Sequence, residues 1–123
     1  MKHKIMKTEN KIVEMSFNFA IEIIDLYKNL IKHNEYVLSK QLLKSGTSIG
    51  ANIEEANAGQ SKRDFIAKMA IASKEARETK YWLKLLNRSK LVEIDYSTYL
   101  VSIEHIVNIL TKIVKTSQES LSA

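Results

Sequence analysis

The segment from Lys62 to Arg88 constrains the fold most strongly, because its apolar and small residues recur at alternating steps of four and three without interruption. The recurring positions are Phe65, Met69, Ala72, Ala76, Thr79, Leu83 and Leu86. This spacing puts them on one face of an α-helix, and strict alternation is typical of near-parallel, coiled-coil-like packing. The segment therefore predicts a long helix over residues 62–88 that lies lengthwise against other helices.

Three further segments share this rhythm and predict helices at residues 11–32, 36–58 and 96–115. Their recurring positions are Ile12, Met15, Phe19, Ile23, Leu26 and Leu30 in the first, Leu38, Leu42, Ser45, Ile49, Asn52 and Ala56 in the second, and Tyr96, Leu100, Ile103, Val107, Leu110 and Val114 in the last. The chain has no proline and three glycines, which argues against a loop-rich or all-β fold. We expect an all-α fold.

The links between these helices are short, and they read HNE, GQ and SKLVEI. Short links between long helices make neighbours antiparallel, so the sequence predicts an antiparallel up-down-up-down four-helix bundle. With 123 residues, the chain is expected to form one domain over residues 1–123. Ser61 is placed to cap the helix that follows it, and the first few residues and the tail SQESLSA are expected to fray.

Composition limits the kinds of site, location and partner that the protein can have. The chain has no cysteine, which excludes disulfides and thiolate metal sites. The basic N-terminus is not followed by an apolar run, and Glu14, Ser16 and Glu22 interrupt the stretch that comes closest to one. Neither a signal peptide nor a membrane span is predicted, and we expect a cytoplasmic protein. The net charge of +5 favours polyanionic partners without identifying one.

Small residues gather within the helix expected at residues 36–58, namely Ser45, Gly46, Ser48, Gly50 and Ala51. A glycine inside a helix costs about 0.5–1 kcal/mol relative to alanine, so two of them need a reason. Small side chains let another backbone approach closely. The neighbour is either another helix of the same bundle or another subunit, and the second interpretation makes Gly46 and Gly50 candidates for an oligomer interface.

A second stripe follows the core stripe of residues 62–88, and it consists of Ile71, Glu75, Glu78, Trp82 and Leu85. Together the two stripes are too wide for one bundle seam. Ile71, Trp82 and Leu85 are therefore further candidates for a contact between subunits.

A polar cluster is also expected, because Asn52 falls on a core position and Glu55 lies one turn later. The tight corner between their helices would let Asn52, Glu55, Glu75 and Glu78 approach one another near Arg77. Buried carboxylates need partners, so a structural role in fixing register is the main interpretation.

The alternative for this cluster is metal-dependent catalysis. The Glu75–Glu78 pair resembles the Glu-x-x-Glu of all-helical, magnesium-dependent nucleotide pyrophosphohydrolases. The second acidic pair of those enzymes is missing, because the helix at residues 96–115 offers only Glu104. No histidine follows a glutamate at the spacing of di-iron bundles. We expect no metal, no cofactor and no catalytic residues.

Residues 48–86, SIGANIEEANAGQSKRDFIAKMAIASKEARETKYWLKLL, resemble the core signature of the 23S rRNA intervening-sequence proteins, a four-helix-bundle family. The matching positions are Ser48, Ile49, Asn52, Ile53, Glu55, Arg63, Phe65, Ile71, Ala72 and Glu78. Ala56 replaces a usual glycine, and Lys74-Glu75 stands where Gly-Ser is common.

This resemblance implies a four-helix subunit that assembles into a homopentameric ring with an axial channel, and no established enzymatic activity. A related bundle, the accessory variability protein of diversity-generating retroelements, pairs with a reverse transcriptase and binds nucleic acid. The resemblance thus implies self-association and an RNA or nucleoprotein partner.

A basic stripe offers a surface for such a partner, and its candidate nucleic-acid-binding residues are Lys62, Arg63, Arg77, Lys80, Lys84 and Arg88. Five copies of a chain with net charge +5 would carry +25, a substantial field for phosphate contact. Tyr81 beside the stripe could stack on a base. Two alternatives are ordinary solvated lysines and a protein–protein adaptor with an acidic partner.

Overall fold

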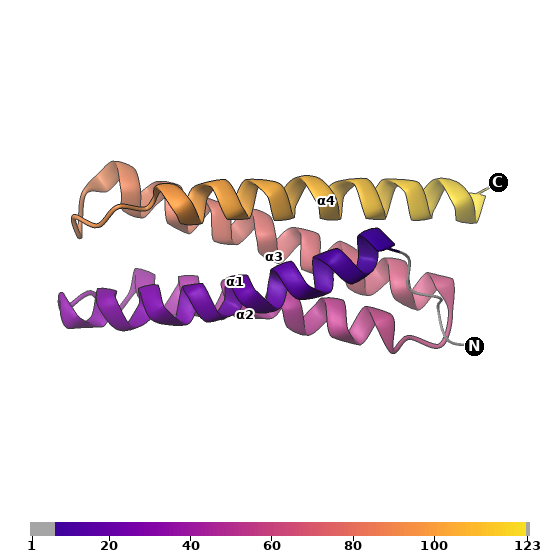
Figure 1. Cartoon of the computed structure of the whole chain (residues 1–123), viewed down its shortest axis with the longest axis horizontal. Coiled ribbons are helices and arrows are strands. Elements are labelled where there is room, and N and C mark those ends of the chain that lie inside the picture. Colours follow the sequence, from indigo (N-terminus) through magenta and orange to yellow (C-terminus); the bar gives the residue numbers. More distant parts are fainter. Residues whose placement is uncertain (1–6, 123) are drawn as a thin grey trace.

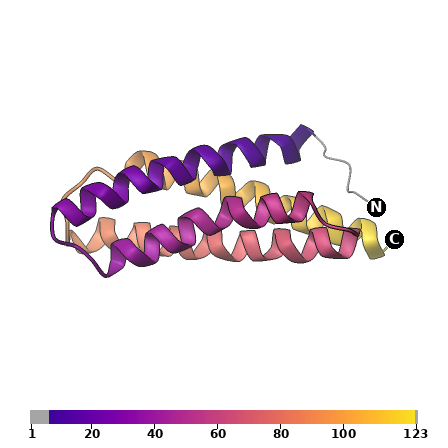
Figure 2. The same cartoon turned by 90° about the horizontal axis from the view of Figure 1, so that it is seen from below.

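The structure, a computed structural model, describes residues 7–122 and the side chains of residues 10–122. This part of the chain forms four helices and no strands: α1 (Lys7–Lys32), α2 (Leu38–Asn57), α3 (Lys62–Ser89) and α4 (Ser97–Ser122). Successive helices run in opposite directions and lie lengthwise side by side, as Figures 1 and 2 show. Each packs on its sequence neighbour, and α1 also packs on α4. The prediction of an all-α, up-down-up-down bundle is confirmed.

The predicted core stripes face the interior. Every recurring position of residues 62–88 is buried, from Phe65 to Leu86, and so are Phe19, Ile49 and Ile103 of the other helices. Asn52 does not take the core position expected for it, because the neighbouring Ile53 is buried instead.

Two hydroxyl groups fix the alignment of α2 against α3. The buried oxygens of Ser45 and Thr79 lie 2.9 Å apart, and Thr79 also donates to the carbonyl of Glu75 at 2.8 Å. Because buried polar groups need partners, this pair favours one register of the two helices.

The corner between α1 and α2 is organised by Glu35, which is 8% exposed. Its carboxylate accepts hydrogen bonds from the backbone N–H groups of Val37, Leu38 and Ser39 at 3.2, 2.8 and 2.7 Å. Burial alone would raise the pKa of Glu35, but these N–H donors and the Ser39 hydroxyl hold it below its usual value. Helix α2 therefore begins at Leu38, two residues later than predicted, because Glu35 supplies its N-terminal cap.

The remaining helix ends show one agreement and two corrections. Ser61 accepts a hydrogen bond from the Asp64 N–H at 3.1 Å, which confirms the predicted cap of α3. The tail was expected to fray, but α4 continues to Ser122. Lys62 at the start of α3 donates to Ser120 at 2.7 Å, and Ser117 is buried, so the tail packs beside α3. Helix α1 also begins at Lys7, four residues earlier than predicted, whereas residues 1–6 lie outside the described range.

None of the helices within residues 7–122 is both long enough and apolar enough to cross a bilayer.

Candidate functional site

Helix α3 presents two different edges on either side of its buried face. One edge lies against α4, because Arg77 donates to the Thr111 hydroxyl at 3.2 Å and Lys80 forms an ion pair with Glu104 at 2.8 Å. The other edge lies toward α2, where the positive charge of Lys44 lies close enough to Glu75 to oppose the rise in its pKa. We call Arg77, Lys80, Lys84 and Arg88 the basic edge, and Ile71, Trp82 and Leu85 the apolar edge.

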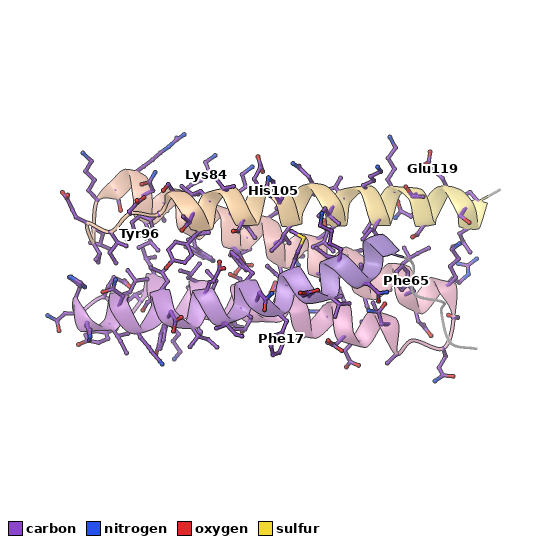
Figure 3. All side chains as sticks on the ribbon, in the orientation of Figure 1. Phe17, Phe65, Lys84, Tyr96, His105 and Glu119 are labelled. Carbon is purple, nitrogen blue, oxygen red and sulfur yellow. The ribbon has the colours of Figure 1, made fainter. Side chains whose placement is uncertain are left out.

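The basic edge borders shallow hollows on the surface. One hollow of about 350 Å³ is lined by Arg77, Lys80, Tyr81, Lys84, Leu85 and Arg88. A second, of about 440 Å³, lies between α3 and α4 and is lined by Lys80, Lys84, Leu100, Val101, Glu104 and His105. Figure 3 shows Lys84 and His105 on the same side of the molecule, beside the first half of α4.

The four cations of this edge differ in their local pairing. Glu104 offsets Lys80, whereas Lys84 and Arg88 are exposed and have no ion pair with another described residue. Tyr81, 57% exposed, stands among them, and its ring meets the Trp82 ring edge-on at 5.1 Å. The edge therefore combines free positive charge with one accessible aromatic face.

Lys62 and Arg63 do not join this edge. They begin α3, fifteen and fourteen residues before Arg77, which is about 20 Å at the rise of an α-helix. Both are exposed, and Lys62 is engaged with Ser120 of α4. The predicted basic stripe is thus two separate groups, and only the four residues from Arg77 to Arg88 form a continuous surface.

The apolar edge remains open in the single chain. Ile71 is 43% exposed and Leu85 is 36% exposed, while Trp82 is partly buried. The Trp82 indole N–H donates to the Glu78 carboxylate at 3.2 Å. Burial raises the pKa of Glu75, and the nearby charge of Glu78 raises it further, although Lys74 and Lys44 oppose both effects.

The predicted polar cluster does not form as one group. Asn52 donates to the Ser48 carbonyl of its own helix at 2.8 Å, and Glu55 is exposed. The Ser45–Thr79 pair places Glu55 opposite residue 69, six residues or about 9 Å along the axis from Glu75. Arg77 lies on the other edge of the helix. No three acidic or histidine side chains in residues 10–122 gather where they could hold a metal ion.

The glycines of α2 face α1 of the same subunit, which favours the first of the two neighbours considered for them, another helix of the same bundle. A Cβ atom on Gly46 would lie 2.9 Å from Cγ2 of Ile23, and one on Gly50 would lie 3.4 Å from the Ser16 hydroxyl. Both neighbours belong to α1. Close approach of α1 therefore explains the buried Gly46, whereas a Cβ atom on Gly50 would make an ordinary contact with α1.

Sequence reasoning missed an apolar face on α1. Phe17, Ile21 and Ile24 are 62%, 47% and 39% exposed, and they follow one another at steps of four and three. Figure 3 shows Phe17 pointing away from the bundle. We call these three residues the α1 face. The sequence contained the signal, because these three apolar residues recur at the steps of four and three that mark one side of a helix.

The architecture and these surfaces can be compared with known proteins. A family model described as 23S rRNA-intervening sequence protein matches residues 8–112. The chain belongs to this family. The resemblance of residues 48–86 is thereby confirmed.

The crystal structure of a similar protein has the same fold. It is described as a protein of unknown function from the S23 ribosomal protein family of Bacteroides thetaiotaomicron VPI-5482. The two chains share 45% identity with a TM-score of 0.83, over 88% of this chain and 98% of the other. A comparison with functionally curated proteins gave no match.

Proposed function

We propose that this protein is a non-enzymatic, self-associating helical bundle of the cytoplasm that binds RNA, alone or in a nucleoprotein. The observation that carries RNA binding is the basic edge, where Lys84 and Arg88 are exposed beside Tyr81 and form no ion pair within residues 10–122. The family name, which refers to sequences within 23S rRNA, favours RNA over other polyanions.

The geometry of the basic edge suits phosphate contact. Arg77 and Arg88 are eleven residues apart, which is about 16 Å along the helix. One strand of a duplex carries a phosphate about every 3.4 Å of its axis, so several successive phosphates can face this edge. Cations on long flexible side chains contact phosphates without reading the bases, and binding should weaken steeply as salt rises.

Self-association would strengthen this surface by repeating it. The pentameric ring implied by the family would place five basic edges on one particle with a formal charge of +25, five times the +5 of one chain. Repeated weak contacts to one RNA raise the overall affinity without any new interaction.

The test is a titration of a structured RNA with the purified protein at several salt concentrations. Lys84→Ala and Arg88→Ala should each weaken binding and lower the slope of log K against log salt by about one. Lys28→Ala, an exposed lysine on α1 with the same charge change, is the matched control. Absence of binding at low salt, or an equal effect of Lys28→Ala, would contradict the proposal.

A protein–protein adaptor is the second candidate, and the exposed α1 face favours it. In that case the basic edge would meet an acidic protein, and Lys84→Ala would weaken capture of that protein without affecting RNA. A nucleotide hydrolase built on Glu75 and Glu78 has less support, because no third ligand gathers beside them within residues 10–122.

A further inference from the structure

We propose that the basic edge takes unpaired RNA, with one base of the strand stacked on Tyr81 and the neighbouring phosphates against the cations around it. This inference rests on the RNA binding proposed above and names the class of RNA that the site would take. The observation that carries it is the place of an exposed aromatic ring in a hollow of about 350 Å³, which Tyr81 shares with four cations and one leucine. This volume lies within the range of about 300–1,000 Å³ in which proteins bind small flat groups.

The Tyr81 ring has an open face. Its side chain is 57% exposed, and its hydroxyl forms no hydrogen bond with another residue in the part of the chain whose side chains are described. The Trp82 ring meets it edge-on, with the centroids 5.1 Å apart and the planes at 72°. In an edge-on pair one ring covers at most one face of the other, so at least one face of Tyr81 is free of Trp82.

Trp82 holds this ring in place. It is partly buried and packs against the core, and its indole N–H donates to the Glu78 carboxylate at 3.2 Å. A ring supported by an anchored neighbour has little conformational freedom left to lose when a base stacks on it. Tyr81 is therefore a prepared platform for a flat ligand.

Cations flank Tyr81 along the same side of α3. Arg77 lies four residues before it, and Lys84 and Arg88 lie three and seven residues after it. Spacings of three, four and seven residues keep side chains on one side of a helix. Along the axis these cations lie about 6 Å before the ring and about 4.5 and 10.5 Å after it. A strand with one base on Tyr81 thus has a cation for the phosphates on each side of that base.

Carboxylates are also present on α3 and α4, but they lie outside this hollow. Glu78, one turn before Tyr81, accepts the indole N–H beside it at 3.2 Å. Glu104 of α4 forms an ion pair with a lysine of the basic edge at 2.8 Å. Glu75 lies six residues before Tyr81, on the edge toward α2. A phosphate beside Tyr81 therefore meets mainly positive charge.

Duplex RNA cannot use Tyr81 as a platform. Its bases are stacked inside the helix, and its major groove is too deep and narrow for side chains, so it offers this edge mainly phosphates and 2′-hydroxyls. An unpaired strand offers the same phosphates and also free base faces, which stack on aromatic side chains. Because every base has a flat face, such a contact selects unpaired over paired nucleotides without selecting a sequence.

The main test compares three probes at one salt concentration and equal phosphate concentration. They are a single-stranded RNA without self-complementarity, the duplex that it forms with its complement, and an abasic strand of the same length. Because the abasic strand keeps the phosphates and lacks the bases, the wild-type protein should bind the single strand about five- to 150-fold more tightly than the abasic strand. The duplex should also bind more weakly than the single strand.

Three variants connect this preference to the ring. Tyr81→Leu should remove the preference for the single strand and leave the affinities for the duplex and the abasic strand unchanged. Tyr81→Phe should bind all three probes like the wild type, because stacking needs the ring and not the hydroxyl. Tyr36→Leu, at a 60% exposed tyrosine in the corner between α1 and α2, is the matched control and should change nothing. Thermal melts check that each variant stays folded.

The outcomes separate this inference from the RNA binding beneath it. If none of the three probes binds at low salt, RNA binding itself is contradicted. If all three bind equally and Tyr81→Leu has no effect, RNA binding stands and only the stacking on Tyr81 is contradicted. The inference also fails if Tyr81→Leu weakens all three probes equally, or if Tyr36→Leu has the same effect as Tyr81→Leu.

Discussion

The glycines of α2 and the apolar edge of α3 both suggest a close neighbour, but the structure satisfies only one of them within the chain. Gly46 and Gly50 both face α1, and at Gly46 the distance leaves no room even for a Cβ atom. Ile71 and Leu85 of α3 remain exposed. A small residue indicates that a neighbouring helix approaches closely. An exposed large apolar residue indicates a surface that no helix of the same chain covers. The following predictions test this difference, from the largest effect to the smallest.

Gly46→Leu should have the largest effect, a loss of about 3 kcal/mol in the free energy of unfolding or more. A Cβ atom alone would already lie 2.9 Å from Cγ2 of the β-branched Ile23, so a larger side chain must push α1 away. Urea denaturation measures the loss. If Gly46→Leu leaves stability intact and changes only assembly, the glycine belongs to a contact between copies.

Trp82→Ala should weaken self-association by about 2 kcal/mol, or roughly thirtyfold, because buried tryptophans dominate many interfaces. Its cost to the free energy of unfolding should be smaller, since Trp82 is only partly buried in the subunit. Sedimentation over a concentration series gives the first quantity and urea denaturation the second. The opposite ranking would place Trp82 in the subunit core.

Glu75→Gln should remove a pH dependence from stability. The pKa of Glu75 is raised in the folded state, so the folded protein holds the proton more tightly than the unfolded chain. Wild-type stability must therefore increase as pH falls through that raised pKa toward the ordinary value near 4.5, and decrease as pH rises. The difference should stay below about 1 kcal/mol, because solvent screens a partly exposed carboxylate.

Melting curves of wild type and Glu75→Gln between pH 4.5 and neutrality check this sign. Glu55→Gln, an exposed change of equal charge on α2, is the matched control. A wild-type protein that gains stability relative to Glu75→Gln as pH rises would show that the carboxylate is stabilised by its neighbours.

Gly50→Ala should have the smallest effect, a gain of about 0.5 kcal/mol. The new Cβ would meet the Ser16 hydroxyl at 3.4 Å, an ordinary contact, while alanine favours the helix over glycine. A small rise in Tm is the expected readout. A clear loss of stability would show that α1 approaches Gly50 as tightly as it approaches Gly46.

The fold followed from the sequence because the recurring apolar positions of a long helix define its buried face. Phe65 to Leu86 were all placed correctly, and so was the Ser61 cap. The start of α2 was missed, because periodicity does not show that the Glu35 side chain bonds three N–H groups. The end of α4 was missed because its contact with Lys62 joins residues 58 positions apart.

The candidate surfaces were harder to predict, since composition gives the size and charge of a side chain but not the helix that covers it. The same sequence pattern at Gly46 fits a neighbour within the chain or outside it. The direction of Arg77, toward α4 and away from the glutamates, depends on how α3 is rotated in the bundle. A second apolar stripe in residues 11–32 was predictable from spacing alone, and it consists of Phe17, Ile21 and Ile24.

The paired hydroxyls of Ser45 and Thr79 carry a consequence for assembly. If α2 slid along α3 by a heptad, the contact between the two oxygens would be lost, at a cost of about 0.5–1.5 kcal/mol, and each hydroxyl would keep only a carbonyl of its own helix. The two helices are therefore held in one register, and every folded molecule has the same spacing between its outward surfaces. Uniform building blocks are what a closed assembly requires, because an error in one joint would be carried to all the others.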